Sequence, residues 1–287
     1  MRRGLLSLCI LVLYALVSHA QTITFINYPN AALTEPWGIN NNGQVVGVYQ
    51  PASNYDHGFL YDITTGVFNS FRVPGSTTST FGWGINDSGA IVGAYVQNSD
   101  GVLHGFRRAP LGGYHKIVDP SGTSSQQAFG TNNLDAIVGS YTAPGPNNMN
   151  GYLYQGGTFT DLIYPGSGFT VANKINDSGT VVGWFLDSSG TERGYMWQSG
   201  IFTEVAPVAG AKLVNVNGIN NFGDMVGVYA DSTGRWHGFL LKQGTLETID
   251  CPGSGQYTTL TAVNDADTFT GICAPFGQQA KGFFGTP

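Results

Sequence analysis

Charged residues are scarce in this chain. Of its 287 residues, 12 are Lys or Arg and 18 are Asp or Glu, which gives a net charge of −6 at pH 7. Proteins that bind nucleic acids present strongly basic faces, so we expect no nucleic-acid partner. Glycine, asparagine, serine, threonine and aromatic residues are abundant instead, a balance typical of turn-dense β-structure rather than of helices or disorder. The composition therefore predicts an all-β protein.

Long hydrophobic runs are missing after the first twenty residues. The apolar run at residues 4–17 follows Arg2 and Arg3 and precedes small residues at Ser18 and Ala20, a pattern typical of a secretory signal peptide. A membrane anchor is the alternative, but the run is too short to span a bilayer comfortably and no second one follows. We expect residues 1–20 to be cleaved off near Ala20, leaving a secreted or periplasmic chain without membrane insertion.

An internal repeat organises the rest of the chain. Six asparagines recur at steps of 44 or 46 residues, and each is followed seven residues later by a glycine within an apolar run. They are Asn40, Asn86, Asn132, Asn176, Asn220 and Asn264. Self-similarity at a fixed period marks a repeat architecture, in which each unit is one supersecondary element.

The second unit shows what each repeat encodes. We expect strands at residues 81–85, 90–96, 104–108 and 114–118, with a tight turn at residues 86–89. The turn asparagine accepts a hydrogen bond from the backbone two residues on, and the glycine after it supplies a positive φ. Two units carry Asp135 and Asp267 there, and Asp tolerates the left-handed region better than most residues. The strand glycine, Gly93 in this unit, predicts a close approach of neighbouring backbone.

The two ends of the chain complement each other. Residues 22–29 match the fourth strand of a unit, and the last unit stops after its third strand at residues 281–284. An open solenoid would need polar capping units at both ends, whereas a propeller closes its seam by pairing the first strand with the last blade. We therefore predict one domain over residues 21–287, a six-bladed β-propeller with four strands per blade, closed by the N-terminal strand.

The same residues carry a family resemblance. Residues 84–93 (GINDSGAIVG), followed by His104-Gly105-Phe106, resemble the exported bacterial repeat family named HAF after its His-Ala-Phe signature. The resemblance covers the whole mature chain and implies a secreted, propeller-like repeat protein with no established activity or catalytic residues. The chain departs from the signature, because Gly replaces Ala throughout and only His57, His104 and His237 keep the histidine.

Cysteine is rare in the predicted mature chain. Cys251 and Cys273 are its two cysteines, and exported chains fold where disulfides form. Other units carry residue pairs at the equivalent places, such as Tyr28 with Tyr49. Two buried free thiols are the alternative, and we predict the disulfide.

One position of the third strand repeats a polar residue before a glycine and an aromatic residue. It holds His57, His104, Asn150, Arg193, His237 and Lys281. Sixfold repetition would place these side chains in a ring, which would bind an anion or acidic glycan most strongly at low pH, where histidines are protonated. Alternatively, each side chain satisfies polar groups at its own blade edge.

Aromatic residues stand three positions before the first three asparagines, at Trp37, Trp83 and Phe129. Exposed at a mouth of the ring they would stack on sugar faces, and buried they would pack between blades. Trp236 lies in a variable loop and is expected to be more accessible. Glu35 is the best candidate for a functional acid, because it breaks the rule of the repeat; otherwise it is a solvated surface residue.

No motif in the sequence predicts catalysis. In half of the units an Asn replaces the Asp directly after the repeated asparagine, whereas a calcium site needs several oxygens converging on one ion, so we interpret these segments as plain turns. The sequence contains no Gly-x-Ser-x-Gly elbow, no histidine pair at metal-ligand spacing and no phosphate-cradling glycine loop. We therefore assign no catalytic residue, metal or cofactor.

The leading functional hypothesis is an exported, non-catalytic binding or interaction protein for a glycan, a small ligand or another protein. Its candidate binding residues are Glu35, Trp37, His57, Trp83, His104, Arg193, Trp236 and His237. The alternative is a propeller hydrolase or lyase acting on polysaccharide, which needs a single cluster of acids in one mouth. Convergence among Glu35, Asp119, Lys174 and Asp250 would favour the enzyme. A structural role at the cell surface is the third hypothesis.

Overall fold

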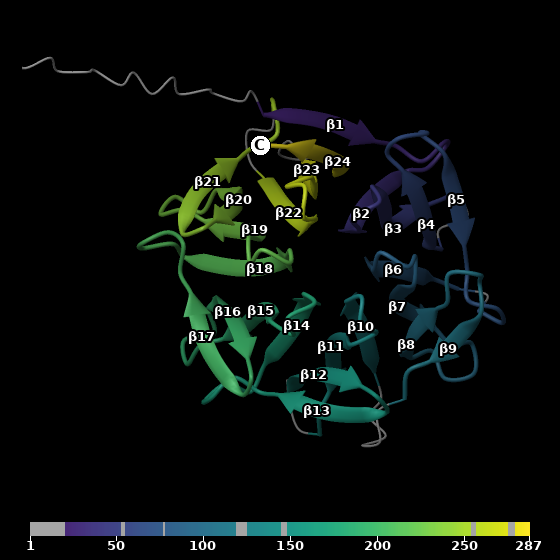
Figure 1. The fold of residues 1–287 in the computed structure, drawn as a ribbon, viewed down its shortest axis with the longest axis horizontal. Coiled ribbons are helices and arrows are strands. Elements are labelled where there is room, and N and C mark those ends of the chain that lie inside the picture. The colour runs from purple at the N-terminus through teal and green to yellow at the C-terminus, as the bar shows by residue number, and fades with distance from the viewer. Residues whose placement is uncertain are drawn as a thin grey trace, which may run out of the picture.

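The chain folds into sheets that stand around a central axis (Figure 1). The computed structural model describes residues 21–52, 55–76, 78–118, 125–144, 148–253, 257–274 and 279–287, and the predicted signal peptide lies outside them. These residues form 24 strands, which confirms the prediction of an all-β propeller. Within the same ranges no helix is long and apolar enough to cross a membrane.

The strands fall into four sets by their distance from the axis (Figure 1). The inner strands are β2 (Leu33–Ile39), β6 (Thr80–Ile85), β10 (Gln126–Thr131), β14 (Thr170–Ile175), β18 (Leu213–Ile219) and β22 (Tyr257–Val263). The second strands are β3 (Gln44–Gln50), β7 (Ile91–Val96), β11 (Ile137–Thr142), β15 (Val181–Leu186), β19 (Met225–Ala230) and β23 (Phe269–Ala274). The third strands are β4 (His57–Asp62), β8 (Leu103–Arg108), β12 (Met149–Gln155), β16 (Glu192–Gln198), β20 (Trp236–Lys242) and β24 (Lys281–Thr286). The outer strands are β5 (Phe68–Phe71), β9 (Tyr114–Lys116), β13 (Thr158–Leu162), β17 (Ile201–Val205), β21 (Thr245–Ile249) and β1 (Thr22–Ile26).

Hydrogen bonding groups these strands into five sheets. Strands β2–β5, β6–β9, β10–β13 and β14–β17 form four sheets of four, and the other strands form one sheet of eight. The eight-stranded sheet contains two antiparallel groups, β18–β21 and β22–β24 with β1, joined by a single parallel pair at Trp236 and Tyr257. The predicted six separate four-stranded sheets are thus not observed, because this one pair bridges the last two groups.

The two ends of the chain meet in one sheet, as predicted. Strand β1 pairs antiparallel with β24, from Thr22 opposite Thr286 to Ile26 opposite Gly282. Just after β1, the ring of Tyr28 stacks on that of Tyr49 in β3, with centroids 3.6 Å apart. Backbone pairing and aromatic packing therefore both close the seam between the last unit and the first.

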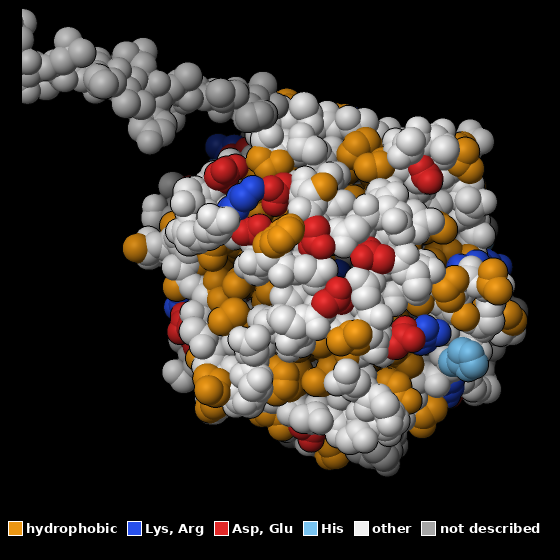
Figure 2. Space-filling view, in the orientation of Figure 1, with side chains coloured by type: hydrophobic (Ala, Val, Ile, Leu, Met, Phe, Trp, Pro, Cys, Tyr) orange, Lys and Arg blue, Asp and Glu red, His pale blue; other side chains and the backbone are white. Residues whose placement is uncertain are grey.

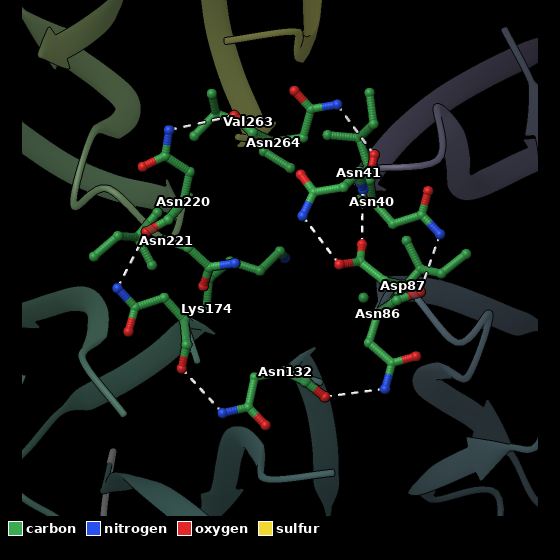
Figure 3. Close-up of a pocket in the computed structure, with 18 of the residues that line it drawn as sticks. Asn40, Asn41, Asn86, Asp87, Asn132, Lys174, Asn220, Asn221, Val263 and Asn264 are labelled. Atoms are coloured by element: carbon green, nitrogen blue, oxygen red, sulfur yellow. Dashed lines mark hydrogen bonds between the residues drawn. The ribbon is translucent and has the colours of Figure 1, made fainter. Parts of the chain in front are cut away.

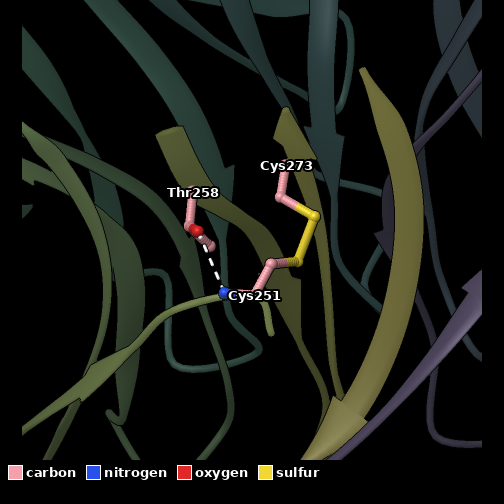
Figure 4. The surroundings of a disulfide bond; sticks show 3 residues. All are labelled: Cys251, Thr258 and Cys273. Atoms are coloured by element: carbon pink, nitrogen blue, oxygen red, sulfur yellow. Dashed lines mark hydrogen bonds between the residues drawn. A yellow bond between two sulfur atoms is a disulfide. The ribbon is translucent and has the colours of Figure 1, made fainter. Parts of the chain in front are cut away.

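The predicted disulfide between Cys251 and Cys273 is present (Figure 4). Cys251 follows β21 and Cys273 lies in β23, so the bond joins two successive units. The corresponding residues Tyr164 and Phe185 are stacked with ring centroids 3.5 Å apart. The disulfide thus takes the place of a stacked aromatic contact between units.

The hairpin turns have the predicted chemistry. Asn132 Oδ1 accepts hydrogen bonds from the backbone N–H of Leu134 and of Ala136, both at 3.0 Å. The third residue after the turn asparagine has a positive φ, 72° at Gly43 and 59° at Asp135. Each turn asparagine therefore organises its own hairpin before it makes any contact with another unit.

A β-bulge interrupts every inner strand at the same place. In β10 the register shifts between Ala128 and Gly130, which leaves Phe129 without a partner in β11. The equivalent bulge residues are Trp37, Trp83, Asn173, Asn217 and Thr261. The glycine of the second strand makes room for the bulge, since a Cβ on Gly139 would lie 1.9 Å from the carbonyl oxygen of Gln127. Bulges re-aim side chains, and these six aim theirs at the axis.

We predict that Gly139→Ala destabilises the fold by about 3 kcal/mol, because its methyl group would collide with backbone that cannot move without breaking the bulge. Gly105→Ala is the matched control, since a Cβ there would be 3.6 Å from its nearest neighbour, Ile117. We expect its effect to stay below about 1 kcal/mol. Denaturant unfolding of both variants measures the difference, and equal stabilities would contradict the close approach at the bulge.

Candidate functional site

The six repeated asparagines form a closed ring of hydrogen bonds around the axis (Figure 3). Each side-chain Nδ2 donates to the backbone carbonyl oxygen of the next asparagine at 2.9–3.3 Å, and Asn264 closes the circle by donating to Asn40. All six side chains are buried. The asparagines are therefore hairpin corners, as predicted, and also the contacts that join one unit to the next.

A second ring, which we call the mouth ring, lies beside the first and alternates strictly between amide and acid. It consists of Asn41, Asp87, Asn133, Asp177, Asn221 and Asp265. Each backbone N–H donates to the side chain of the next member at 2.8–2.9 Å. Each asparagine Nδ2 also donates to the Oδ2 atoms of both neighbouring aspartates at 2.8–3.1 Å.

The alternation in the mouth ring matches donors to acceptors. An amide supplies two N–H groups, and an ionised carboxylate only accepts, so six amides or six acids could not close this pattern. Figure 2 shows acidic side chains gathered around the centre of this face. No group of three or more His, Cys, Asp or Glu side chains suited to holding a metal ion is found in the described part of the chain. The mouth ring is therefore an acidic rim over a narrow hollow of about 70 Å³.

A larger cavity of about 230 Å³, which we call the axial cavity, lies on the axis where the bulges aim their side chains. Its lining consists of Trp37, Trp83, Phe129, Asn173, Lys174, Asn217 and Thr261. Six of these seven are the bulge residues, so the backbone irregularity repeated in every unit builds the cavity.

The axial cavity is aromatic on one half and polar on the other. The rings of Trp83 and Phe129 lie 4.8 Å apart between centroids, and Trp37 occupies the corresponding place in the neighbouring unit. On the polar half, Asn173 Nδ2 donates to the carbonyl oxygen of Val216 at 2.9 Å, and Asn217 Nδ2 donates to that of Leu260 at 2.9 Å. These amide donors are committed to neighbouring strands, so the aromatic half dominates the surface open to a ligand.

Lys174 is the charged residue of the axial cavity, and it borders the mouth hollow as well. Its side chain points into the centre of the ring (Figure 3), and its Nζ donates to the carbonyl oxygen of Phe129 at 2.9 Å. Burial lowers the pKa of Lys174 from 10.5 to about 7, because removal from water disfavours the charged form. An amine whose charged form is disfavoured by burial thus faces an aromatic cavity.

Lys174 breaks the repeat in the sequence, whereas no sequence motif marks Asn173, Asn217 or Thr261 as lining residues. The residue two positions before the turn asparagine is small in the other five units. Those residues are Gly38, Gly84, Gly130, Gly218 and Ala262. A long charged side chain at a position otherwise reserved for small residues breaks the repeat more sharply than Glu35 does.

Three predicted candidates lie near the axis. Trp37 and Trp83 line the axial cavity and are half-buried. They are therefore neither exposed at a mouth of the ring nor fully packed between blades.

Glu35 lies on the same strand as Trp37. Burial raises the pKa of Glu35, as does nearby Asp56, while a hydrogen bond from Trp37 opposes the shift. Asp119 lies outside the described residues. No contact joins Glu35, Lys174 and Asp250 in the described part of the chain.

The proposed ring of basic side chains does not meet at one point. His104 Nε2 pairs with Asp100 at 3.0 Å, and Arg193 Nε pairs with Asp187 at 3.0 Å, each within its own unit. His57 Nδ1 contacts the hydroxyl of Tyr49 at 3.1 Å. These local partners favour the alternative in which each side chain satisfies its own blade edge.

The last two candidates lie on β20, away from the axial cavity. His237 Nδ1 is 2.9 Å from Asp250 and its Nε2 is 3.4 Å from Asp231. The Trp236 ring lies 5.5 Å from that of Tyr257 between centroids, at the parallel pair that joins two units. The prediction that Trp236 lies in a variable loop is therefore wrong, because it begins β20 and is half-buried against Tyr257.

We predict that Asn133→Asp destabilises the protein by about 2 kcal/mol at pH 8. The change removes two donors, each 2.8 Å from a carboxylate oxygen of Asp87 or Asp177, and it sets a third carboxylate between them. The carboxylates of Asp87 and Asp177 raise the pKa of the new carboxyl group in the folded state. The loss of folding stability therefore appears as pH rises through that pKa and is small at pH 4. Thermal melts at both pH values measure it against Asn69→Asp on the exposed strand β5; equal losses at the two pH values would contradict the interpretation.

We predict that Lys174→Met changes how stability depends on pH. The unfolded chain holds the lysine proton up to about pH 10.5 and the folded protein only up to about pH 7, so the stability of the native chain rises with pH between these values. The variant lacks this rise. Denaturant unfolding at pH 6, 8 and 10 compares it with the native protein and with Lys212→Met, a change at an exposed lysine; parallel curves for all three would refute the burial of the amine.

Comparison with known proteins supports the fold. Neither a family model nor a curated protein matches the sequence. AofleA from Arthrobotrys oligospora is similar in structure, with a TM-score of 0.56 and 12% identity over 92% of this chain and 86% of that one. The Aleuria aurantia lectin, described as a six-bladed β-propeller that recognises fucose, has a TM-score of 0.53 and 10% identity over 88% and 91%. The β-propeller domain of the Trilobed protease from Pyrococcus furiosus has a TM-score of 0.53 and 8% identity over 89% and 94%. At these identities the likeness shows a shared propeller fold.

Proposed function

We propose that this protein is an exported binding protein that holds a small ligand with a flat ring in its axial cavity. The observation that carries the proposal is the cavity of about 230 Å³ with aromatic side chains on one half. Apolar concave sites with a few polar groups are the usual form of small-ligand sites. An engineered apolar cavity of about 150 Å³ is enough to bind benzene, so a substituted ring fits this one.

The polar half of the axial cavity favours a flat apolar ring over a sugar as the ligand. A sugar presents many hydroxyl groups, each of which needs a partner when it is buried. The amide donors of Asn173 and Asn217 and the hydroxyl of Thr261 are already engaged with backbone carbonyl oxygens of neighbouring units. The aromatic rings of the other half offer stacking surfaces that require no such partners.

We also propose that the protein has six blades and is exported. We interpret the eight-stranded sheet as two blades, because one parallel pair joins its halves and the asparagine ring has six members. The disulfide fits the oxidising compartment that a cleaved leader at residues 1–20 would provide. Membership of the HAF repeat family stays a prediction from the sequence.

The experiment is a binding measurement with neutral ring compounds. Benzamide and benzyl alcohol should change the tryptophan fluorescence of the native protein, and Phe129→Ala should weaken their binding at least tenfold by removing a stacking surface. Trp236→Ala is the matched control, because its ring packs on Tyr257 outside the axial cavity, and it should bind normally. Melting curves confirm that both variants are folded.

Two outcomes would contradict this proposal. If no ring compound binds to the native protein, the axial cavity is only a packing defect. If methyl glycosides bind and ring compounds do not, the ligand is a glycan, and the engaged amides must rearrange.

A further inference from the structure

We infer that the ligand of the axial cavity carries a carboxylate group on its ring and that Lys174 binds this carboxylate. The inference rests on the proposed function and adds the chemical class of the ligand. It depends on the position of Lys174, on the hydrogen bonds that its amine makes, and on the charges around it.

Lys174 occupies a position of the repeat at which the other five units have a small residue. The equivalent position holds Gly in four units and Ala in one, and a Cβ on Gly130 would come within 2.8 Å of the Lys174 Cα. A buried amine costs folding free energy unless its charge is compensated. A residue that breaks the repeat and destabilises the fold is expected at a functional position.

The amine of Lys174 has donors left for a ligand. An ammonium group has three N–H donors, and the carbonyl oxygen of Phe129 is the acceptor seen for it among the described residues. No ion pair of Lys174 occurs in that part of the chain. A carboxylate on a ring that stacks against Phe129 and Trp83 would accept from the remaining donors and neutralise the charge.

The surrounding charges favour a singly charged, compact anion. The titratable groups facing Lys174 are Asp87, Asp177 and Asp265 of the mouth ring, and the rest of the lining of both cavities is uncharged. The three carboxylates repel an anion at that mouth. A carboxylate therefore reaches Lys174 from the aromatic side, with its ring remaining among the bulge residues.

Binding of a carboxylate must be coupled to a proton. The bound anion favours the charged form of the amine and so raises the pKa of Lys174 above its value of about 7 in the empty cavity. Above pH 7 the protein takes up a proton when the ligand binds. The affinity for a carboxylate should then fall by up to tenfold for each pH unit above 7.

The test compares benzoate with benzamide, which have the same ring and differ in charge. Calorimetry with the full mature chain should show that benzoate binds at least tenfold more tightly than benzamide at pH 6.5. Lys174→Met should remove this preference, so that benzoate binds no more tightly than benzamide, whereas Lys212→Met should behave like the native protein. At pH 8 the benzoate enthalpy should differ between phosphate and Tris buffers, and this difference should vanish in Lys174→Met.

The outcomes separate the inference from the proposed function. If benzoate and benzamide bind with equal affinity and Phe129→Ala loses both, the inferred carboxylate site at Lys174 would be refuted. The ring-binding function of the axial cavity would remain. A benzoate preference that survives in Lys174→Met would also overturn it, because the anion would then bind elsewhere. Failure of both compounds to bind would remove the proposed function together with the inference.

Discussion

The hydrogen bond from each buried asparagine amide to the carbonyl of the next asparagine fixes the spacing of the inner strands. A buried amide N–H needs an acceptor, and the carbonyl oxygen that each asparagine amide reaches in the adjacent unit is available only when that unit stands at the right distance from the axis. The bond from Asn264 to Asn40 applies the same requirement at the seam where the chain begins and ends. Each unit thus depends on the next, and opening one seam leaves both a donor and an acceptor without partners.

The fixed spacing decides what lies on the axis. The bulge in each inner strand turns one side chain inward, and the glycine of the second strand makes the space that the bulge needs, as the 1.9 Å approach at Gly139 shows. The residue at the bulge is itself free to vary, because it takes no part in the strand pairing. Trp37, Asn173 and Thr261 occupy equivalent backbone positions with unlike side chains. The repeat therefore supplies a constant frame with six variable positions that face one cavity.

Much of the frame could be predicted from the sequence, because turn chemistry is local. The Asn132 turn, the positive φ of Asp135 and the pairing of β1 with β24 follow from residues whose roles can be recognised within one unit. The disulfide was predicted from the expected export of the chain and was supported by the register of the repeat. The structure has five sheets rather than the predicted six because Trp236 pairs with Tyr257. This pairing depends on the relative orientation of two units, which no local sequence pattern specifies.

The site was harder to predict, because its parts become neighbours only when the ring closes. The aspartates of the mouth ring look like separate turn residues in the sequence, and their alternation has meaning only once Asn133 is seen to donate to Asp87 and Asp177. The three histidines of the repeated position, His57, His104 and His237, have partners within their own units. A search by residue type therefore drew attention to His104, whereas Lys174 is the charged residue that lines the axial cavity.

Departures from the repeat carry different information at different positions. The alternation of the mouth ring breaks sixfold symmetry, but it leaves every donor matched to an acceptor, so it has a sufficient structural cause. The lysine at position 174 stands where four other units have glycine, and its amine makes a single hydrogen bond within the described residues, to the carbonyl oxygen of Phe129. It also borders both the acidic hollow and the aromatic cavity. The mouth ring completes a hydrogen-bond network, whereas Lys174 costs stability, keeps donors available and faces a cavity. Lys174 is therefore the residue on which we base the chemistry of the site.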